Sequence, residues 1–174
     1  MYLSTMTRPD ITYAVSTLSQ YLDSPHTTHL EAVKRVFRYL AGTKHLGLTL
    51  GGNCLTTKDN ADGILGFSDA DWASNTHRHS ISGFVFFVGT GPVSWSSKKQ
   101  PIVTLSSTES EYVALTHATK DILWIHKLLL ETEFLHYFET PTSLYCDNQG
   151  AIELSKILRF HARTKHINVH FHFV

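Results

Sequence analysis

The stretch from Ile64 to Trp72 constrains this chain most, because a short apolar run ends there in two carboxylates. Alternate residues of an extended strand point to the same side. Four residues of the stretch therefore share one face: Leu65, Phe67, Asp69 and Asp71. We expect this face to be the buried one. Because an unpaired buried charge is costly, the carboxylates predict a nearby cation, and a metal ion is the usual one.

Composition bounds the class of protein. The 174 residues are 42% hydrophobic, enough for one good core, and fifteen basic residues balance fifteen acidic ones. Any affinity for nucleic acid must therefore come from a local basic patch. The two cysteines, Cys54 and Cys146, show no disulfide or metal spacing and fit a reducing compartment. With no signal peptide and no apolar run near the ~20 residues that span a bilayer, the sequence predicts an intracellular protein without a membrane partner.

Two helices are expected in the first fifty residues. The first extends from a cap at Asp10 to about Leu22. The second opens with a capping-box pattern at residues 28–31 and ends at Gly42. Three basic residues lie off its apolar stripe and form either a solvated face or a phosphate-contacting one: Lys34, Arg35 and Arg38.

A polar, glycine-bearing stretch at 51–61 predicts a boundary between segments 1–60 and 61–174. A hairpin-like segment at 45–50 precedes it. After it, the apolar pattern predicts strand, strand, strand, helix, strand and helix in this order: 64–72, 81–88, 93–97, 107–133, 142–146 and 149–158. This order is typical of an α/β layer with a mixed sheet, its first three strands antiparallel. The last residues, 167–174, fit either a strand or a helix.

Two further carboxylates stand where a structural role does not fully explain them. Ser106 and Glu109 form a capping box, whereas Glu111 is in phase with the stripe of the long helix that faces the sheet. Asp147 follows a strand and precedes a helix, so it is either an N-cap or a ligand. Three inward carboxylates in one place require divalent metal. Two such ions activate water in phosphodiester hydrolysis, and oxygen ligands select Mg²⁺ or Mn²⁺.

Six blocks of the sequence carry a family resemblance, in this order: 66–73, 82–86, 94–100, 106–112, 145–149 and 163–167. By these blocks, which follow the family's order, the sequence resembles the ribonuclease H region of copia-type retrotransposon polyproteins. Residues 1–50 resemble the end of the preceding reverse transcriptase region. The resemblance implies a helical remnant of the polymerase thumb or connection over 1–60, followed by a ribonuclease H-like domain over 61–174.

What the resemblance implies is an endonuclease that cuts the RNA strand of RNA–DNA hybrids with two Mg²⁺ ions held by four acidic residues. By motif, Asp69, Glu111 and Asp147 match three of these residues, and Asp71 is a further candidate ligand. The rest of the reverse transcriptase would be a partner. The expected location is a cytoplasmic virus-like particle or the nucleus.

The chain departs from the family at its end. A further strand and a final Asp-bearing helix are expected after the segment at which this chain stops, and Asn168 stands where the family commonly has an Asp that we take to be a helix cap. The fourth ligand is therefore expected to be missing. Three hypotheses stay open: a hybrid-cleaving ribonuclease, an inactive truncated remnant that at most binds nucleic acid, and a module that supports a polymerase.

Several polar residues are candidates for contacts with nucleic acid. Lys98, Lys99 and Gln100 follow a strand and form either a phosphate-gripping or a solvated turn. Four residues flank the proposed site as hydrogen-bonding partners for sugar hydroxyls or as helix caps: Ser106, Ser107, Asn148 and Gln149. The three tryptophans, Trp72, Trp95 and Trp124, are interpreted as core or rim aromatics, with base stacking as the alternative. Four histidines near the C-terminus, at 161, 166, 170 and 172, suggest a polar helix face rather than a zinc site.

Overall fold

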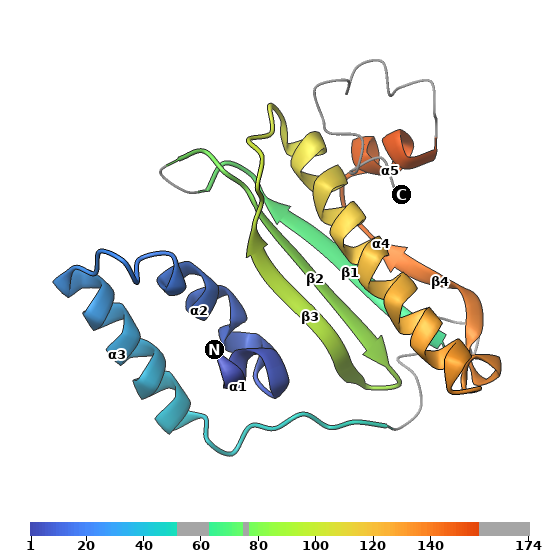
Figure 1. Cartoon of the computed structure of the whole chain (residues 1–174), viewed down its shortest axis with the longest axis horizontal. Helices are drawn as coiled ribbons and strands as arrows, with labels where there is room; N and C mark the ends of the chain where they lie inside the picture. The colour runs from blue at the N-terminus through green and yellow to red at the C-terminus, as the bar shows by residue number, and fades with distance from the viewer. Residues whose placement is uncertain (52–62, 75–76, 157–174) are drawn as a thin grey trace.

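A computed structural model of the chain describes residues 1–51, 63–74 and 77–156. Figure 1 shows a four-stranded sheet with one long helix across it; two short N-terminal helices lie beside the edge strand β3, and a longer helix lies beyond them. The elements are, in order, α1 (Tyr2–Met6), η1 (Pro9–Ile11), α2 (Thr12–Ser19), α3 (Thr27–Gly42), β1 (Gly63–Asp71), β2 (Ile81–Val88), β3 (Gly91–Lys99), α4 (Ser107–Glu131), η2 (Leu135–Tyr137), β4 (Glu139–Tyr145) and α5 (Gln149–Lys156).

The strand order is β3-β2-β1-β4, with antiparallel pairing among β1, β2 and β3 and parallel pairing of β1 with β4. This arrangement confirms the predicted α/β class with a mixed, ribonuclease H-like sheet. The parallel pairing matters for the site, because the carboxyl ends of parallel strands meet at the same edge of a sheet. β1 and β4 therefore end side by side.

The face of β1 that we expected to be buried is the open one. Ile64 and Gly66 are buried beneath α4, and Phe86, their neighbour on β2, is completely buried there, whereas Phe67 is 41% exposed. The prediction was wrong because α4 covers the opposite set of alternate side chains. A Cβ at Gly66 would collide with the Phe86 ring, so the glycine makes room for this completely buried side chain.

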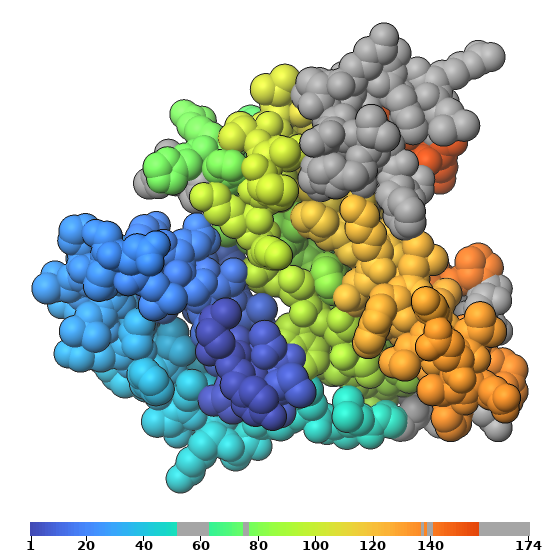
Figure 2. Space-filling view, viewed as in Figure 1, coloured from blue at the N-terminus to red at the C-terminus, as the bar shows by residue number. Residues whose placement is uncertain are grey.

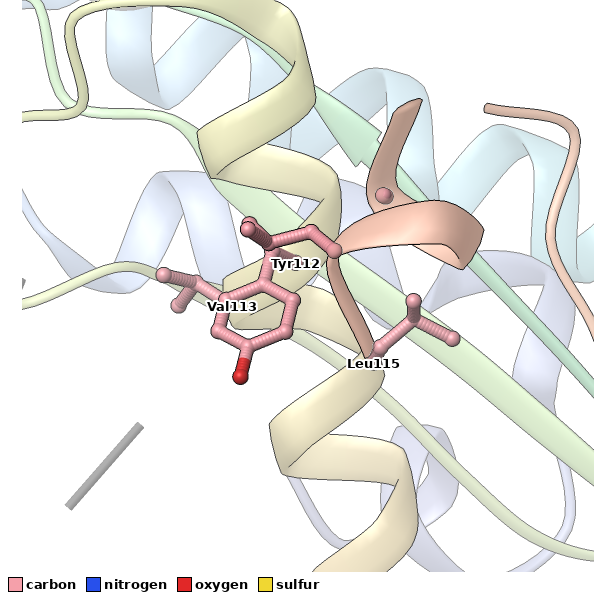
Figure 3. Packing of buried hydrophobic residues seen from close by; sticks show 5 residues of the cluster. Tyr112, Val113 and Leu115 are labelled. Carbon is pink, nitrogen blue, oxygen red and sulfur yellow. The ribbon is translucent and has the colours of Figure 1, made fainter. Parts of the chain in front are cut away.

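Helix α4 joins two parts of the core. Towards its C-terminus, Ala118, Ile122 and Ile125 pack on the sheet around Phe86. Near its N-terminus, Tyr112, Val113 and Leu115 pack with residues of α5 (Figure 3). Burial on both sides holds the first turns of α4 firmly between β1 and α5.

The N-terminal helices differ in detail from the prediction. Asp10 does not cap a helix but lies in η1, where its carboxylate accepts hydrogen bonds from Arg8 at 2.7–3.2 Å. The α3 capping box is formed by His26 and His29 rather than by residues 28–31. In both places polar side chains bond to neighbours a few residues away: Asp10 pairs with Arg8, and His29 accepts from the His26 backbone N–H.

The same N-terminal segment packs on β3, where the indole N–H of Trp95 donates to the Ser4 carbonyl at 2.7 Å. The predicted hairpin at 45–50 is absent, since these residues form no strand in the structure. Predictions for residues 157–174, including the four histidines, Asn168 and the block at 163–167, lie outside the described residues, as does Cys54. Within the described ranges, none of the helices has the length and apolar character needed to cross a membrane.

Candidate metal centre

Two aspartates meet where β1 and β4 end. Asp69 is two residues before the end of β1, and Asp147 is two residues beyond β4. Together with Phe67, Tyr145 and Cys146 they line an open hollow of about 380 Å³. Both carboxylates are exposed to solvent. The parallel pairing of the two strands thus brings the two aspartates to one edge of the sheet, as expected, but exposes both instead of burying Asp69.

Glu111 approaches the same place from α4. Its residue is only 6% exposed, and its Oε1 accepts a hydrogen bond from the backbone N–H of Ala70 at 3.2 Å. The Cys146 thiol donates to its Oε2 at 3.8 Å. The inward orientation predicted from the helical stripe is confirmed, because the first turns of α4 are fixed against β1 and α5.

Three potential ligand atoms form the tightest group. One atom each from Glu111, Cys146 and Asp147 lies within 4.8 Å of the others. Asp69 is outside this group, although its charge acts on Glu111. Asp71 is the exposed last residue of β1, and the structure brings it neither into this group nor into the hollow.

Burial, the largest cause, and the negative charges of Asp69 and Asp147 together raise the pKa of the Glu111 carboxyl to about 7, against the hydrogen bonds from Ala70 and Cys146 that lower it. Burial also raises the pKa of the Cys146 thiol. A protonated thiol is a poor ligand for Mg²⁺, whereas carboxylate oxygens suit it. The oxygen donors of Glu111, Asp147 and Asp69 therefore fit a hard divalent cation, whose charge would offset their repulsion.

The raised pKa of Glu111 predicts a pH dependence of stability. Between pH 4.5 and about 7 the native protein binds more protons at this group than the unfolded chain does. Without divalent metal, we expect the free energy of unfolding to fall by up to roughly 3 kcal/mol as the pH rises through this interval. The substitution Glu111→Gln should remove that fall. Urea denaturation in EDTA at several pH values measures both proteins. A constant difference between them across the interval would contradict the prediction.

The two helix caps beside the site are now assigned. Asn148 Oδ1 accepts from the Ala151 N–H at 2.9 Å and caps α5, so Asp147 is not needed as the cap. Ser106 caps α4 by accepting from the Glu109 N–H at 3.3 Å, as predicted. The Glu109 carboxylate reaches the Leu105 N–H at 2.7 Å, which gives it the structural role expected of it.

The remaining nucleic-acid candidates separate by exposure. Gln100 is completely buried, and its amide donates to Ser82 Oγ at 2.8 Å and to the Ser110 carbonyl at 2.9 Å, so its prediction as a surface contact was wrong. The chain turns inward there as β3 ends. The others keep some exposure: Lys98, Lys99, Ser106, Ser107, Asn148 and Gln149. Lys34, Arg35 and Arg38 are exposed on α3, which lies on the far side of α2 from the sheet in Figure 1.

Sequence reasoning missed Cys146. The cysteine was set aside because it lacks a metal-binding spacing, although its position next to Asp147 at a strand end was a usable signal. The hollow also has an aromatic wall, since the rings of Phe67 and Tyr145 stack with centroids 5.5 Å apart. Both side chains are more than two-fifths exposed. Flat apolar surface thus adjoins the carboxylates.

Three of the known proteins that are similar to this chain come from plant transposons. It is 41% identical over 175 residues to the retrovirus-related Pol polyprotein from transposon TNT 1-94 of Nicotiana tabacum. The matched region covers 100% of this chain and 12% of that polyprotein. The chain is 43% and 44% identical over 169 residues to the corresponding polyproteins from transposons RE1 and RE2 of Arabidopsis thaliana, covering 97% of this chain and 11% of each.

No protein-family model and no solved structure matches the chain. It spans 11–12% of the length of the transposon polyproteins above. The identity nevertheless extends along all or nearly all of this chain, through the segments before and after residue 60 alike. The chain therefore belongs to the family of retrovirus-related Pol polyproteins of copia-type transposons.

Proposed function

We propose that this chain is the ribonuclease H segment of such a polyprotein and hydrolyses the RNA strand of RNA–DNA hybrids with Mg²⁺ or Mn²⁺. One observation carries the proposal: the acidic residues of three separate elements gather where β1 and β4 end, on a ribonuclease H-like sheet. A stability role does not explain this gathering, because burial of Glu111 and repulsion from the other two carboxylates both raise the pKa of its carboxyl.

In this proposal Asp69, Glu111 and Asp147 hold the cations. Bound divalent ions would lower the pKa of a water molecule and stabilise the leaving oxygen of the scissile phosphate. The chain itself supplies orientation: the Ala70 N–H and the Cys146 thiol hold the Glu111 carboxylate in place, and the Asn148 cap leaves Asp147 available. Asp71 has no role in this arrangement.

The surroundings suit a nucleic-acid substrate. Phe67 and Tyr145 offer flat apolar surface beside the carboxylates, on which a base or sugar can pack. Polar side chains at the starts of α4 and α5 are assigned to sugar hydroxyls: Ser106, Ser107, Asn148 and Gln149. The lysines at the end of β3, Lys98 and Lys99, are assigned to phosphates. Contacts to the 2′-hydroxyl would distinguish RNA from DNA.

The domain assignment, partner and location are part of the proposal. Residues 1–60 are assigned to the end of the reverse transcriptase thumb or connection and 61–174 to the ribonuclease H domain. The partner is the rest of the reverse transcriptase. We place the activity in a cytoplasmic virus-like particle or in the nucleus.

The matched pair Asp69 and Asp71 tests the function. Both are exposed, lie two residues apart on β1 and share one face, but only Asp69 lines the hollow. We expect Asp69→Asn to slow cleavage of a labelled RNA–DNA hybrid by about a hundredfold, because a lost metal ligand removes several kcal/mol of transition-state stabilisation. Asp71→Asn should retain most activity.

The assay uses the folded wild-type chain with Mg²⁺ and then with Mn²⁺. A folded wild type that cleaves with neither ion would refute the proposed function and support the inactive remnant. Equal losses in the two variants would refute the assignment of Asp69 over Asp71.

A second candidate function, support of a polymerase, is favoured by the N-terminal helices. Apolar side chains of α1, α2 and α3 line a groove of about 380 Å³, and Phe37 at its side is 66% exposed. A surface of this kind is typical of a contact with another protein segment. Co-purification of this chain with the reverse transcriptase segment of such a transposon polyprotein tests this second function. A folded chain that does not bind that segment would contradict it.

A further inference from the structure

A second hollow, distinct from the carboxylate site, lies between α4 and β3. Helix α4 packs mainly on β1 and β2 and reaches the edge strand β3 through the hydrogen bond from Ser94 to Asp121, so a space remains between α4 and the rest of β3. The resulting groove has a volume of about 470 Å³. Figure 2 shows it as a recess between the yellow-green surface of β3 and the orange surface of α4.

The groove carries an excess of positive charge. Lys98 and Lys99 come from the end of β3, and Lys120 lies on α4 across from them, with His117 one turn earlier on that helix. The acidic residue in the groove, Asp121, accepts a hydrogen bond from Ser94 Oγ at 2.6 Å. Three lysines against one aspartate is a local surplus in a chain whose formal net charge is zero. Such a surplus attracts a polyanion.

An aromatic side chain adjoins the lysines. Trp124 lies one turn beyond Lys120 on α4, lines the groove and is 62% exposed. Exposed tryptophan next to lysine is the combination by which proteins hold single strands of nucleic acid, with ring stacking for the bases and ammonium groups for the phosphates. A simple acidic peptide would use the charges but would leave the indole without a planar partner.

The groove is close to the carboxylates along the sheet. Ala70, whose N–H binds Glu111, pairs with Ser82, and Ser82 pairs with Lys98. Two strand spacings of about 4.8 Å therefore separate the Ala70 backbone from that of Lys98. The groove lies on the α4 side of the sheet and Asp69 on the opposite side, so a nucleic-acid strand that reaches both must pass around the C-terminal end of β1.

We propose that the groove between α4 and β3 binds the sugar–phosphate backbone of one nucleic-acid strand, with Lys98 and Lys120 on phosphates and Trp124 against a base. The proposal rests on the proposed function and deepens it, in that the strand is a single-stranded extension of the hybrid whose scissile phosphate lies at the carboxylates. Unpaired bases of such an extension can pack on Trp124. The binding itself requires no metal, so the two claims can be tested separately.

Equilibrium binding of the full chain to a labelled RNA–DNA hybrid with a single-stranded extension, measured by fluorescence anisotropy in EDTA, tests the groove. We expect the double variant Lys98→Gln/Lys120→Gln to bind roughly fiftyfold more weakly at about 0.1 M salt and to lower the slope of log K against log salt by nearly two. The matched control Lys44→Gln/Lys127→Gln loses the same charge at exposed positions outside the groove and should bind within about threefold of wild type. Unchanged urea denaturation curves establish that the variants fold.

Trp124→Leu separates stacking from charge. It should weaken binding about tenfold without changing the salt slope, since stacking releases no counterions. Unchanged affinity would overturn the placement of a base against Trp124. Equal binding by the groove variant and the control variant would overturn the claim that the groove binds nucleic acid. A groove that binds an acidic protein instead would give this result. A wild type that binds but does not cleave refutes the proposed function alone, whereas cleavage with unaltered binding by the groove variant refutes the groove alone.

Discussion

Glu111→Gln should reduce metal-dependent cleavage of an RNA–DNA hybrid by about a thousandfold, the largest loss expected of any single substitution in this chain. Glu111 is the buried member of the acidic group and lies between Asp147 and the end of β1. Glutamine keeps the shape of the side chain but carries no charge, so it cannot hold a divalent cation in the same way. Single-turnover cleavage with saturating Mg²⁺ measures the effect.

The same substitution should leave the fold intact or stabilise it. Removing the charge relieves the burial cost and the repulsion that raise the pKa of Glu111. Above pH 7 and without metal, the free energy of unfolding should therefore equal or exceed that of the wild type. Loss of activity with full stability is the signature of a functional carboxylate, whereas a structural one would lose both.

Glu109→Gln is the matched control, because Glu109 lies two residues earlier on α4 and its carboxylate accepts the Leu105 N–H. Glutamine can accept the same hydrogen bond, so we expect activity within a few fold of wild type and a stability loss of about 0.5–1 kcal/mol. Equal losses of activity in the two variants would contradict the assignment of Glu111 as the ligand on α4.

Phe86→Ala should lower the free energy of unfolding by about 3–5 kcal/mol, the largest stability effect that we expect. The ring is completely buried between β2 and α4, where Ile64, Ala118 and Ile122 surround it, and Gly66 leaves the space that it fills. A cavity of this size cannot close, because the sheet and helix around it are held by their own hydrogen bonds. Urea denaturation monitored by circular dichroism measures the change.

Phe67→Ala is the comparison, on the next strand and the opposite face of the sheet. Phe67 is 41% exposed and contacts Tyr145 and Phe87 through its ring, so its removal should cost about 1–2 kcal/mol. If Phe86→Ala does not fold, Phe86→Leu, at about 1–2 kcal/mol, provides the measurement. A larger loss for Phe67→Ala than for Phe86→Ala would mean that α4 covers the other face.

Much of the fold followed from local pattern. The strand and helix order from residue 64 onward is as predicted, with strand bounds that differ by up to three residues, because apolar periodicity and turn residues act over short distances. The α4 cap at Ser106 and the inward phase of Glu111 also followed, since both depend only on positions along one helix. The N-terminal caps were less accurate, because several neighbouring side chains there compete for the same backbone groups.

The sequence by itself determined which side chains share a strand face, which carboxylate of α4 points inward, and that acidic residues end two strands of one sheet. Only the tertiary structure decided that α4 covers the face of Phe86 rather than that of Phe67, and that Gln100 is buried. The same holds for the contact of Cys146 with Glu111 and for the groove that Lys98 and Lys120 both line. The physical reason is that alternation along a strand defines two faces without saying which one is covered. Contacts between distant elements depend on how those faces pack, and packing is a property of the whole fold.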